Sequence, residues 1–379
     1  MCGCRFSFPA ENASFAAIMK LYIIAGEASG DLHGANLIKA LKARSPELVC
    51  RVWGGDLMQA AGGHLVRHYR DLAFMGFWEV LKNLRTILGN LRFCKQDILE
   101  FQPDAVVLID YPGFNLRVAR WAKQQGFKVI YYISPQIWAW HTSRVRDIRR
   151  DVDKMLVILP FEQAFFKQYG VAAEFVGHPL LDAILPNTDQ EPVRQDKDTI
   201  VLLPGSRKQE IQRILPVMLE SSVDFPGYKF VIAAAASLPA EFFGPFLQHY
   251  PQVSLVRGKT YDLLRQARAA MVKSGTSTLE TALLDVPQVV CYAGNPVSYF
   301  IARRLVNVKY ISLVNLILDR PLVRELIQQE LNRENLSAAM AAILEPDKAD
   351  EIRKGYEELR RLLGEGGASG KAAEAILAQ

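Results

Sequence analysis

The sequence contains little cysteine and no recognisable set of metal ligands. Its five cysteines are scattered, and only Cys2 and Cys4 lie close together. No second pair stands at the spacing of a structural zinc site, and no H-E-x-x-H sequence is present. We therefore expect no metal ion, and we expect reduced thiols of the kind found in cytoplasmic proteins.

Long hydrophobic runs are also absent. No apolar stretch approaches the roughly 18 residues that a membrane-spanning helix needs, so the sequence predicts no such helix. The first residues, MCGCRFSFPAENASFAAI, contain one basic residue and lack the apolar core of a signal peptide. We interpret residues 1–18 as a loose leader that precedes the first strand.

Neither sign of charge dominates. Lys and Arg number 45 against 40 Asp and Glu, which leaves a net charge of +5 and a pI near 8.8. This surplus is too small to indicate a nucleic-acid-binding protein, but it suits an anionic substrate or a membrane surface. The composition, 50% hydrophobic and 22% charged, is that of a globular protein, and 379 residues are enough for two domains.

What the sequence does contain is a repeated alternation of short apolar runs and helical patterns. One series runs from LYIIA to AEFVG, a polar stretch follows at 186–198, and a second series begins at TIVLLPGS. This pattern predicts an α/β protein with two doubly wound parallel-sheet domains that face a ligand cleft. The expected segments are a leader (1–18), a first domain (19–186), a linker (187–198), a second domain (199–345) and a helical tail that packs back on the first domain (346–379).

The first apolar run leads directly into a glycine-rich turn. In IIAGEASGDLHG, three glycines are spaced by four residues, at Gly26, Gly30 and Gly34. A strand, a tight turn and a helix N-terminus would leave backbone N–H groups free to bind an anion or a hydroxyl-rich ligand. The spacing differs from the dinucleotide-binding G-x-G-x-x-G. Glycines that serve only close packing are an equally good interpretation of this stretch.

Two turns in the second half have the composition of a phosphate site. IVLLPGSRKQEI and MVKSGTSTLETALL each pass from an apolar run through glycine to a helical pattern. Glycine permits close approach of the backbone, arginine pairs with phosphate oxygens, and a helix N-terminus favours anions. The candidate residues for a nucleotide diphosphate and its ribose are Gly205, Ser206, Arg207, Ser274, Gly275, Thr276, Ser277 and Glu280.

Ordinary structural roles are open for two of these residues. Arg207 could be a solvated arginine after a turn, and Glu280 could pair with the backbone N–H of Ser277 as a capping residue. A P-loop is excluded, because GKT at 258–260 lacks a glycine five residues before Gly258.

A carboxylate ends one buried run of the first half. AVVLIDYPGFNLR places Asp110 at the carboxyl end of an apolar strand, where the side chain would face a ligand. Removal from water raises the pKa of a carboxyl group toward the range of a useful general base. Capping of the next helix is the alternative role for Asp110.

The segment 74–95 mixes large apolar residues with basic ones. This pattern fits an interfacial helix on a membrane or the wall of an acyl-chain pocket, and a buried core helix is the alternative. Arginines at 144, 146, 149 and 150 could extend the same basic surface. The residues proposed for membrane or acyl-chain contact are Phe74, Met75, Phe77, Trp78, Leu81, Lys82, Leu84 and Arg85.

Six stretches together resemble the lipid-A-disaccharide synthase family in order and spacing, over nearly the whole chain from about residue 20 onward. GEASGD with SPQIWAW is the most specific combination, because LLPGSR and SGTSTLE have looser relatives among other nucleotide-sugar enzymes. The stretches are GEASGD (26–31), SPQIWAW (134–140), FVGHPLLD (175–182), LLPGSR (202–207), SGTSTLE (274–280) and YISLVNLI (310–317).

The resemblance implies a glycosyltransferase of the GT-B fold, with two Rossmann-like domains and the donor site chiefly in the second. Members of this family join UDP-2,3-diacylglucosamine to 2,3-diacylglucosamine 1-phosphate, release UDP, and form a β(1→6) disaccharide with inversion at the anomeric carbon. We accordingly expect no cofactor, no nucleic-acid partner, a peripheral position on the cytoplasmic face of the inner membrane, and a homodimer.

The resemblance also implies roles for individual residues. Asp110 matches the proposed catalytic carboxylate, Glu280 would hold the UDP ribose, and Asn315 would lie at the cleft. Gly113 departs from the family pattern, since some members carry an aspartate there, so a second essential acid at that position is in doubt. The acceptor-side loop would contain Gly26, Glu27 and Ser29.

Two other functions are compatible with the same sequence. Non-hydrolysing UDP-N-acetylglucosamine 2-epimerases share the two-domain architecture and a similar UDP loop, but a soluble sugar would leave the apolar segment 74–95 unexplained. A non-catalytic protein that binds nucleotide sugars is the other alternative, and such a protein would function with asparagine in place of Asp110.

Overall fold

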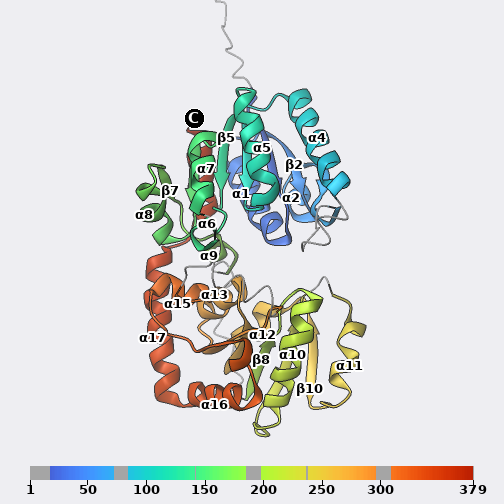
Figure 1. Ribbon diagram of the computed structural model, residues 1–379, viewed down its shortest axis with the longest axis vertical. Coiled ribbons are helices and arrows are strands. Elements are labelled where there is room, and N and C mark those ends of the chain that lie inside the picture. The colour runs from blue at the N-terminus through green and yellow to red at the C-terminus, as the bar shows by residue number, and fades with distance from the viewer. Residues whose placement is uncertain are drawn as a thin grey trace, which may run out of the picture. The chain divides into compact units, whose positions relative to one another are not determined.

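The computed structural model describes residues 18–71, 84–140, 142–184, 198–235, 238–295 and 309–378. These residues fall into two compact units that divide between Ile130 and Tyr131. Strands and helices alternate along the chain in both units (Figure 1).

The first half of the chain builds a seven-stranded sheet in the order β3-β2-β1-β4-β5-β6-β7. β1 pairs in parallel with β2 and with β4, and β6 pairs in parallel with β7. Every residue of β4 is buried, which is why its sequence AVVLI shows no polar alternation. The strands are β1 (Lys20–Ala25), β2 (Val49–Gly54), β3 (His64–His68), β4 (Ala105–Ile109), β5 (Lys128–Tyr132), β6 (Lys154–Val157) and β7 (Ala173–Phe175).

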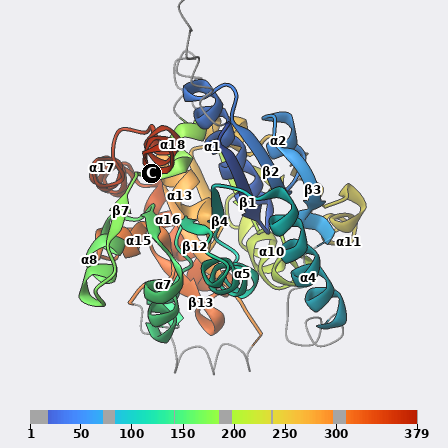
Figure 2. The same cartoon turned by 90° about the horizontal axis from the view of Figure 1, so that it is seen from above.

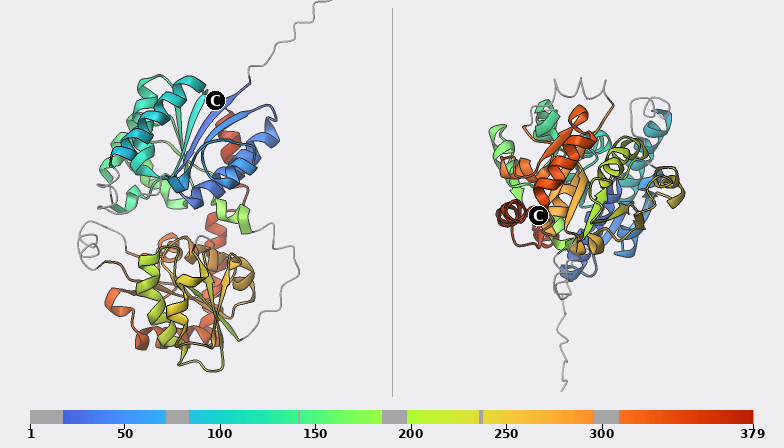
Figure 3. Two further views of the ribbon diagram at one scale, coloured as in Figure 1. Left: turned by 90° about the vertical axis from the view of Figure 1, so that its right-hand side faces the viewer. Right: turned by 90° about the horizontal axis from the view of Figure 1, so that it is seen from below.

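Helices cover both faces of this sheet. α1 and α2 lie on one face of β1, β2 and β4, and α4 and α5 lie on the other (Figures 2 and 3). Right-handed crossovers between parallel strands produce this arrangement. The helices are α1 (Ala28–Arg44), α2 (Asp56–Ala60), α4 (Leu84–Phe101), α5 (Pro112–Gln124), α6 (Ile137–Trp140), α7 (Val145–Asp151), α8 (Pro160–Gln168) and α9 (Pro179–Ile184), with 3₁₀ turns η1 (Tyr69–Asp71) and η2 (Thr142–Arg144).

The second half builds a six-stranded sheet in the order β10-β9-β8-β11-β12-β13, in which every pair is parallel. The strands are β8 (Thr199–Leu203), β9 (Lys229–Ala234), β10 (Val253–Arg257), β11 (Ala269–Lys273), β12 (Gln288–Tyr292) and β13 (Glu325–Ile327). The helices are α10 (Lys208–Ser222), α11 (Gly244–Leu247), α12 (Thr260–Gln266), α13 (Thr276–Leu283), α15 (Leu313–Leu318), α16 (Arg333–Leu344), α17 (Pro346–Leu363) and α18 (Ala368–Leu377), with 3₁₀ turns η4 (Ala240–Phe242) and η5 (Gln328–Glu330).

Alternate residues of the second sheet enter two separate hydrophobic cores. Ile200 and Leu202 of β8 join a cluster that includes residues of α10 and α16. Val201 and Leu203 of the same strand pack with Leu264 of α12. Because successive side chains of a strand point to opposite faces, a continuous apolar run such as TIVLL fills both cores at once.

The C-terminal helix α18 is fixed by side chains from earlier in the chain. Asp182 of α9 accepts hydrogen bonds from the three successive backbone N–H groups of 367–369, at 2.6–3.2 Å. Lys154 of β6 donates to the carbonyl of Ala375 over 2.7 Å. A carboxylate beside these groups satisfies N–H donors that a helix N-terminus leaves unpaired. The last residue of the FVGHPLLD stretch is therefore a helix cap.

The predicted fold class is confirmed, because both halves are doubly wound parallel sheets. The apolar runs of the two series form β1, β2 and β4 to β12. The sequence did not reveal β3 and β13, which are edge strands that carry charged residues and lack an apolar run. The two units divide within β5, while the predicted linker 187–198 lies almost wholly outside the described residues, so its position stays a prediction.

Candidate active site

A cavity of about 530 Å³ lies at the carboxyl ends of β8, β9 and β11 in the second unit. This edge is the expected ligand position in an open parallel sheet. The residues predicted to bind a nucleotide come from the turns after β8 and β11, and six of the eight line the cavity. These six are Gly205, Ser206, Gly275, Thr276, Ser277 and Glu280.

The two turns are neighbours because β8 and β11 are paired, with Leu203 opposite Val272. Gly205 has φ +110° and Gly275 has φ +157°, backbone conformations that residues with a side chain rarely adopt. The glycines therefore let the chain turn from each strand directly into a helix, so that α10 and α13 both begin beside the cavity.

Glu280 lies in α13 and is bound by hydroxyl groups. Tyr261 Oη donates to Glu280 Oε1 over 3.0 Å, and the Ser277 side chain is a second partner. Burial raises the pKa of Glu280, and these hydrogen bonds oppose the rise. A buried carboxylate that already accepts from hydroxyl groups has the chemistry needed to receive the hydroxyls of a sugar.

Arg207, Ser274 and Asn315 do not line this cavity. The Arg207 side chain is 54% exposed at the start of α10. Ser274 Oγ donates to the carbonyl of Ile311 over 2.8 Å. The Asn315 amide donates to and accepts from the backbone of Val323, at 2.8 and 2.9 Å. Ser274 and Asn315 thus have internal partners, and their contacts with a ligand stay predictions.

Sequence reasoning missed several residues that line the cavity. The cavity is also lined by Lys273, the last residue of β11, and by Arg265 of α12. The tripeptide 258–260, which the sequence analysis considered only as an incomplete P-loop, lines it as well. Among the residues that the structure describes, Arg265 Nη2 is buried without a hydrogen-bond partner. The sequence could have indicated Lys273 as a cavity residue. A lysine directly between an apolar run and a Ser-Gly turn ends a buried strand beside the ligand edge of the sheet.

In the first unit, Asp110 directly follows β4 and has a left-handed backbone with φ 44°, as does Tyr111 with φ 49°. Two consecutive residues with side chains in this region store backbone strain. The buried Asn115 of α5 holds them, because its Nδ2 donates to the carbonyls of Asp110 and Ile109 at 2.8 and 3.1 Å. Strain kept in this way is typical of functional sites.

Burial raises the pKa of Asp110 to about 6, and the negative charge of Glu27 adds to the rise. A carboxylate with this pKa is ionised at neutral pH and is a stronger base than an ordinary aspartate. Tyr111, not Asp110, is the N-cap residue of α5, and the Asp110 side chain accepts a hydrogen bond from the backbone of Tyr111.

The glycine-rich turn lies against this strained pair. A Cβ added to Gly26 would lie 2.3–2.6 Å from ring atoms of Tyr111, so only glycine permits the approach. Glu27 is the N-cap residue of α1, and Ser29 is exposed in the first turn of the same helix. The turn therefore brings Glu27 into the electrostatic environment of Asp110.

The rest of the turn serves packing. A Cβ on Gly34 would lie 2.6 Å from Met58 Sδ, so a larger residue would force the Met58 side chain to move. Asp31 is buried and accepts hydrogen bonds from the backbone N–H groups of Gly55 and Met58 at 2.8 and 3.0 Å, which caps α2. The packing interpretation therefore holds for Gly26 and Gly34. The binding of a ligand by this turn stays a prediction.

The predicted interfacial segment is described only in part. α4 begins at Leu84 and continues to Phe101, beyond the predicted end at residue 95. Its exposed residues include Leu88 and Leu99, with exposed fractions of 46% and 43%. The predicted contact residues that lie outside the described ranges are Phe74, Met75, Phe77, Trp78, Leu81 and Lys82.

Exposed apolar and basic residues share one face of α4. Arg85 and Arg92 are exposed. Spacings of three, four and seven residues put Arg85, Leu88, Arg92 and Leu99 on one face of the helix. Cys94 and Ile98 are fully buried on the other side. The core-helix and interfacial-helix interpretations thus each fit one side of α4.

Two further properties bear on the site. In the described ranges, no three His, Cys, Asp or Glu side chains are grouped so that they could hold a metal ion. No helix within those ranges combines the length and apolar composition needed to cross a membrane.

Solved structures with the same architecture include a UDP-GlcNAc 2-epimerase from Neisseria meningitidis bound to UDP-GlcNAc, with a TM-score of 0.66 and 14% identity over 95% of this chain and 100% of that one. The calicheamicin glycosyltransferase CalG4 is similar with a TM-score of 0.62 and 16% identity, over 96% and 98% of the two chains. At such identities the likeness shows the GT-B type of fold that the sequence predicted.

Sequence relatives are more informative. A lipid-A-disaccharide synthase of Syntrophus aciditrophicus (strain SB) is 43% identical over 93% of this chain and 95% of its own length. A lipid-A-disaccharide synthase of Myxococcus xanthus (strain DK1622) is 38% identical over 94% of this chain and 97% of its own length. The family model described as lipid-A-disaccharide synthetase matches residues 21–378. With nearly the whole chain matched, the protein belongs to the lipid-A-disaccharide synthetase family.

Proposed function

We propose that this chain is an inverting glycosyltransferase that joins UDP-2,3-diacylglucosamine to 2,3-diacylglucosamine 1-phosphate. The products are UDP and a β(1→6)-linked disaccharide 1-phosphate, so the reaction is a step of lipid A biosynthesis. The observation that carries the proposal is the family match over residues 21–378. Relatives named lipid-A-disaccharide synthase at 36–43% identity support it.

The UDP donor binds in the cavity of the second unit. The turns that contain Gly205 and Gly275 receive the diphosphate, and Glu280 receives hydroxyls of the ribose. The two paired strands that end at these turns support this assignment, as does the hydroxyl partner that Glu280 already has in Tyr261. Arg207, at the start of α10, supplies positive charge as UDP leaves.

Asp110 acts as the general base on the acceptor. The 6-hydroxyl oxygen attacks the anomeric carbon of the donor, and its proton passes to the Asp110 carboxylate. The new carbon–oxygen bond forms as the bond from the anomeric carbon to the β-phosphate oxygen breaks, and the electron pair of that bond leaves with UDP. Attack from the face opposite UDP converts the α-linked donor to a β-linked product. A pKa of about 6 for Asp110 supports this role.

The acceptor lies against the loop that contains Gly26, Glu27 and Ser29. The contact between this loop and the strained residues 110–111 supports the assignment. A sugar phosphate there would meet the exposed first turn of α1, whose N-terminus favours anions.

The lipid substrates place the enzyme at the cytoplasmic face of the inner membrane. The exposed face of α4, with Arg85, Leu88, Arg92 and Leu99, serves as the docking surface. Each methylene buried in the bilayer contributes about 0.8 kcal/mol, so a few such side chains are sufficient for reversible binding. Segment 74–83, which precedes α4, carries the remaining predicted contact residues.

The test is disaccharide formation from the two lipid substrates in detergent without added metal. We expect product that contains both sugars, with one UDP released for each disaccharide. Conversion of UDP-N-acetylglucosamine to its 2-epimer without a lipid acceptor would instead identify an epimerase, like the Neisseria meningitidis enzyme of similar fold. UDP binding without turnover of either substrate would indicate a protein that only binds nucleotide sugars.

A further inference from the structure

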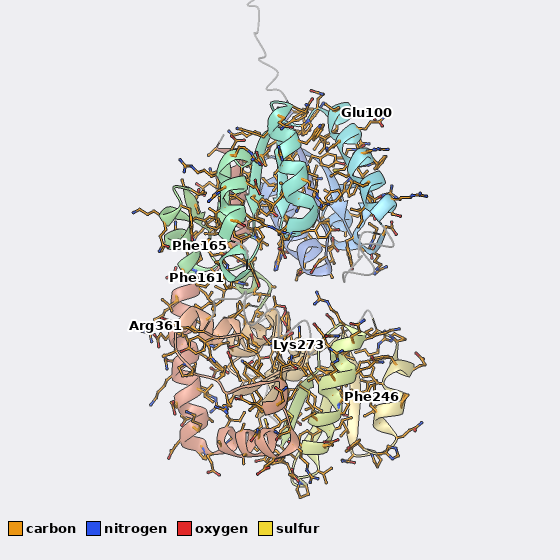
Figure 4. All side chains as sticks on the ribbon, in the orientation of Figure 1. Glu100, Phe161, Phe165, Phe246, Lys273 and Arg361 are labelled. Atoms are coloured by element: carbon orange, nitrogen blue, oxygen red, sulfur yellow. The ribbon has the colours of Figure 1, made fainter. Side chains whose placement is uncertain are left out.

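Lys273 occupies an unusual place at the end of β11. Its strand is otherwise AAMV, and each of those four residues is buried. The Lys273 side chain is only 18% exposed, yet the residue lines the cavity (Lys273 is labelled in Figure 4). Burial of a lysine removes its ammonium from water and is unfavourable unless an anion or hydrogen-bond acceptors compensate.

The side chain lies between the two glycine turns. A Cβ built on Gly205 would be 3.5 Å from Cγ and Cδ of Lys273, and a Cβ built on Gly275 would be 3.8 Å from its Nζ. The lysine side chain therefore lies beside both turns, within van der Waals distance of where a Cβ would stand at either glycine. The same two turns are those proposed to receive the diphosphate of the donor.

One carboxylate holds this cation in place. Glu210 Oε1 lies 3.1 Å from Lys273 Nζ, and the same oxygen accepts a hydrogen bond from Arg207 Nη1 at 3.3 Å. Lys273 Nζ has three N–H donors, and Glu210 occupies one of them. Glu210 thus bears a single negative charge between two positive ones, so the local group keeps a net charge of +1.

Lys273 borders the cavity between two turns whose glycines both have positive φ. An anion in this cavity would meet Lys273 in a poorly solvated place, where a charge-assisted hydrogen bond is stronger than on an open surface. A nucleoside diphosphate fits the volume and the charge, and it is the ligand that the proposed function already requires.

We propose that Lys273 binds the diphosphate of the nucleotide donor, between the turns at Gly205 and Gly275, while Glu210 holds its ammonium in position. This inference rests on the proposed donor site and adds a phosphate-binding residue to it. Lys273 contacts the diphosphate and not the nucleoside, so it contributes to the affinity for UDP and not to the affinity for uridine. Glu210 acts through Lys273 as a positioning residue.

The test compares UDP and uridine binding to the full-length parent, Lys273→Met and Lys208→Met. UDP affinity is measured by calorimetry, and uridine binding by ligand-observed NMR. Methionine keeps most of the aliphatic stem beside Gly205 but removes the charge. Lys208 is the matched control, because it is an exposed lysine of α10 that stacks on Phe242 and does not line the cavity.

We expect Lys273→Met to weaken UDP binding by about tenfold to hundredfold, as the loss of a charge-assisted hydrogen bond implies, with uridine binding unchanged. Lys208→Met should stay within about twofold of the parent for both ligands. UDP affinity of Lys273→Met equal to the parent's would overturn the inference. An equal loss of uridine binding would also overturn it, since the lysine would then maintain the whole pocket, and so would an equal loss in Lys208→Met. Failure of the parent itself to bind UDP would instead remove the proposed donor site.

Discussion

At the scale of single residues, the proposed role of Asp110 as a base depends on how its surroundings change the pKa of its carboxyl group. The residue follows a fully buried strand, stands in a left-handed conformation held by Asn115, and has Glu27 as an electrostatic neighbour. Burial and that neighbour raise its pKa to about 6. The Asp110 carboxyl group is therefore mostly protonated below pH 6, and above about pH 6 it is mostly ionised and able to accept a proton.

Asp110→Asn removes the base and should lower the rate of disaccharide formation by about 10²-fold or more. In the parent, the acid limb of the kcat/KM profile should rise through a pH of about 6 and level off above it, because only the ionised carboxylate accepts the proton. Initial rates of product formation between pH 5 and 8.5 measure both effects. Retention of full activity in Asp110→Asn would exclude a base at this position.

Stability provides the control for this variant. The pKa of Asp110 in the folded protein lies above its unfolded value, so stability is lost as pH rises from the unfolded pKa through about 6 and stays lower above it. Asparagine remains neutral and should stabilise the fold at pH 8 by about 1–3 kcal/mol relative to aspartate. A lower melting temperature of Asp110→Asn at pH 8 would indicate a structural contribution to the loss of activity.

Glu27→Gln should shift the acid limb of the kcat/KM profile to lower pH. The Glu27 charge raises the pKa of Asp110, and its removal leaves only burial to do so. The matched control is Glu47→Gln, which removes a carboxylate from the exposed turn before β2. An acid limb at the parent's position in Glu27→Gln would mean that the two carboxylates do not interact in solution.

At the scale of elements, the same structural unit occurs at each candidate site: a buried parallel strand, a sharp turn and a helix. Its parts are local, which is why the sequence predicts them. Apolar runs mark β4, β8 and β11, and Gly205 and Gly275 mark the turns after the last two. The turn after β4 lacks glycine and could not be predicted, because the buried amide of Asn115 stabilises its left-handed backbone.

Asp182→Ala should destabilise the second unit through α18. Three backbone N–H groups at 367–369 would lose their acceptor, and loss of a helix cap costs about 0.5–2 kcal/mol. Urea denaturation measures the change, and hydrogen exchange should show faster exchange in 368–377. Glu365→Ala, an exposed carboxylate before α18, should change stability by less than about 0.5 kcal/mol. Unchanged exchange in α18 of Asp182→Ala would show that other contacts hold the helix.

At the scale of the whole molecule, the question is which part of the protein surface could bind to a membrane that holds the lipid substrates. The proposed substrates carry acyl chains, and no described helix could span a membrane. Exposed apolar and basic side chains are the kind of surface that docks reversibly on a bilayer. α4 supplies leucines and arginines together on one face, whereas its opposite side belongs to the core.

The double variant Leu88→Asp, Leu99→Asp should float at least about tenfold less with anionic liposomes than the parent does. Each exposed leucine contributes on the order of 1–2 kcal/mol when it enters the bilayer, and aspartate adds repulsion from anionic lipid. Leu57→Asp is the control, because Leu57 is equally exposed, at 46%, but lies on α2 on the other face of the sheet. Equal flotation of the parent and the double variant would exclude α4 as the docking surface.

The sequence by itself determined where the glycine turns lie, which family the chain belongs to, and every strand except the edge strands β3 and β13. These properties depend on neighbours along the chain, because burial on both faces requires apolar runs and a sharp turn requires glycine. They were sufficient to predict six of the residues that line the cavity proposed for the donor.

Only the tertiary structure decided which distant side chains meet. The pairing of β8 with β11 brings Lys273 to Glu210, the packing of α5 under β4 brings Asn115 to the Asp110 carbonyl, and the fold of YISLVNLI onto β13 gives the Asn315 amide internal partners. Strand order and helix packing result from the burial of the whole apolar surface at once, which no local pattern encodes. The charge arrangement at Lys273 and the backbone strain at Asp110 therefore arise from the fold.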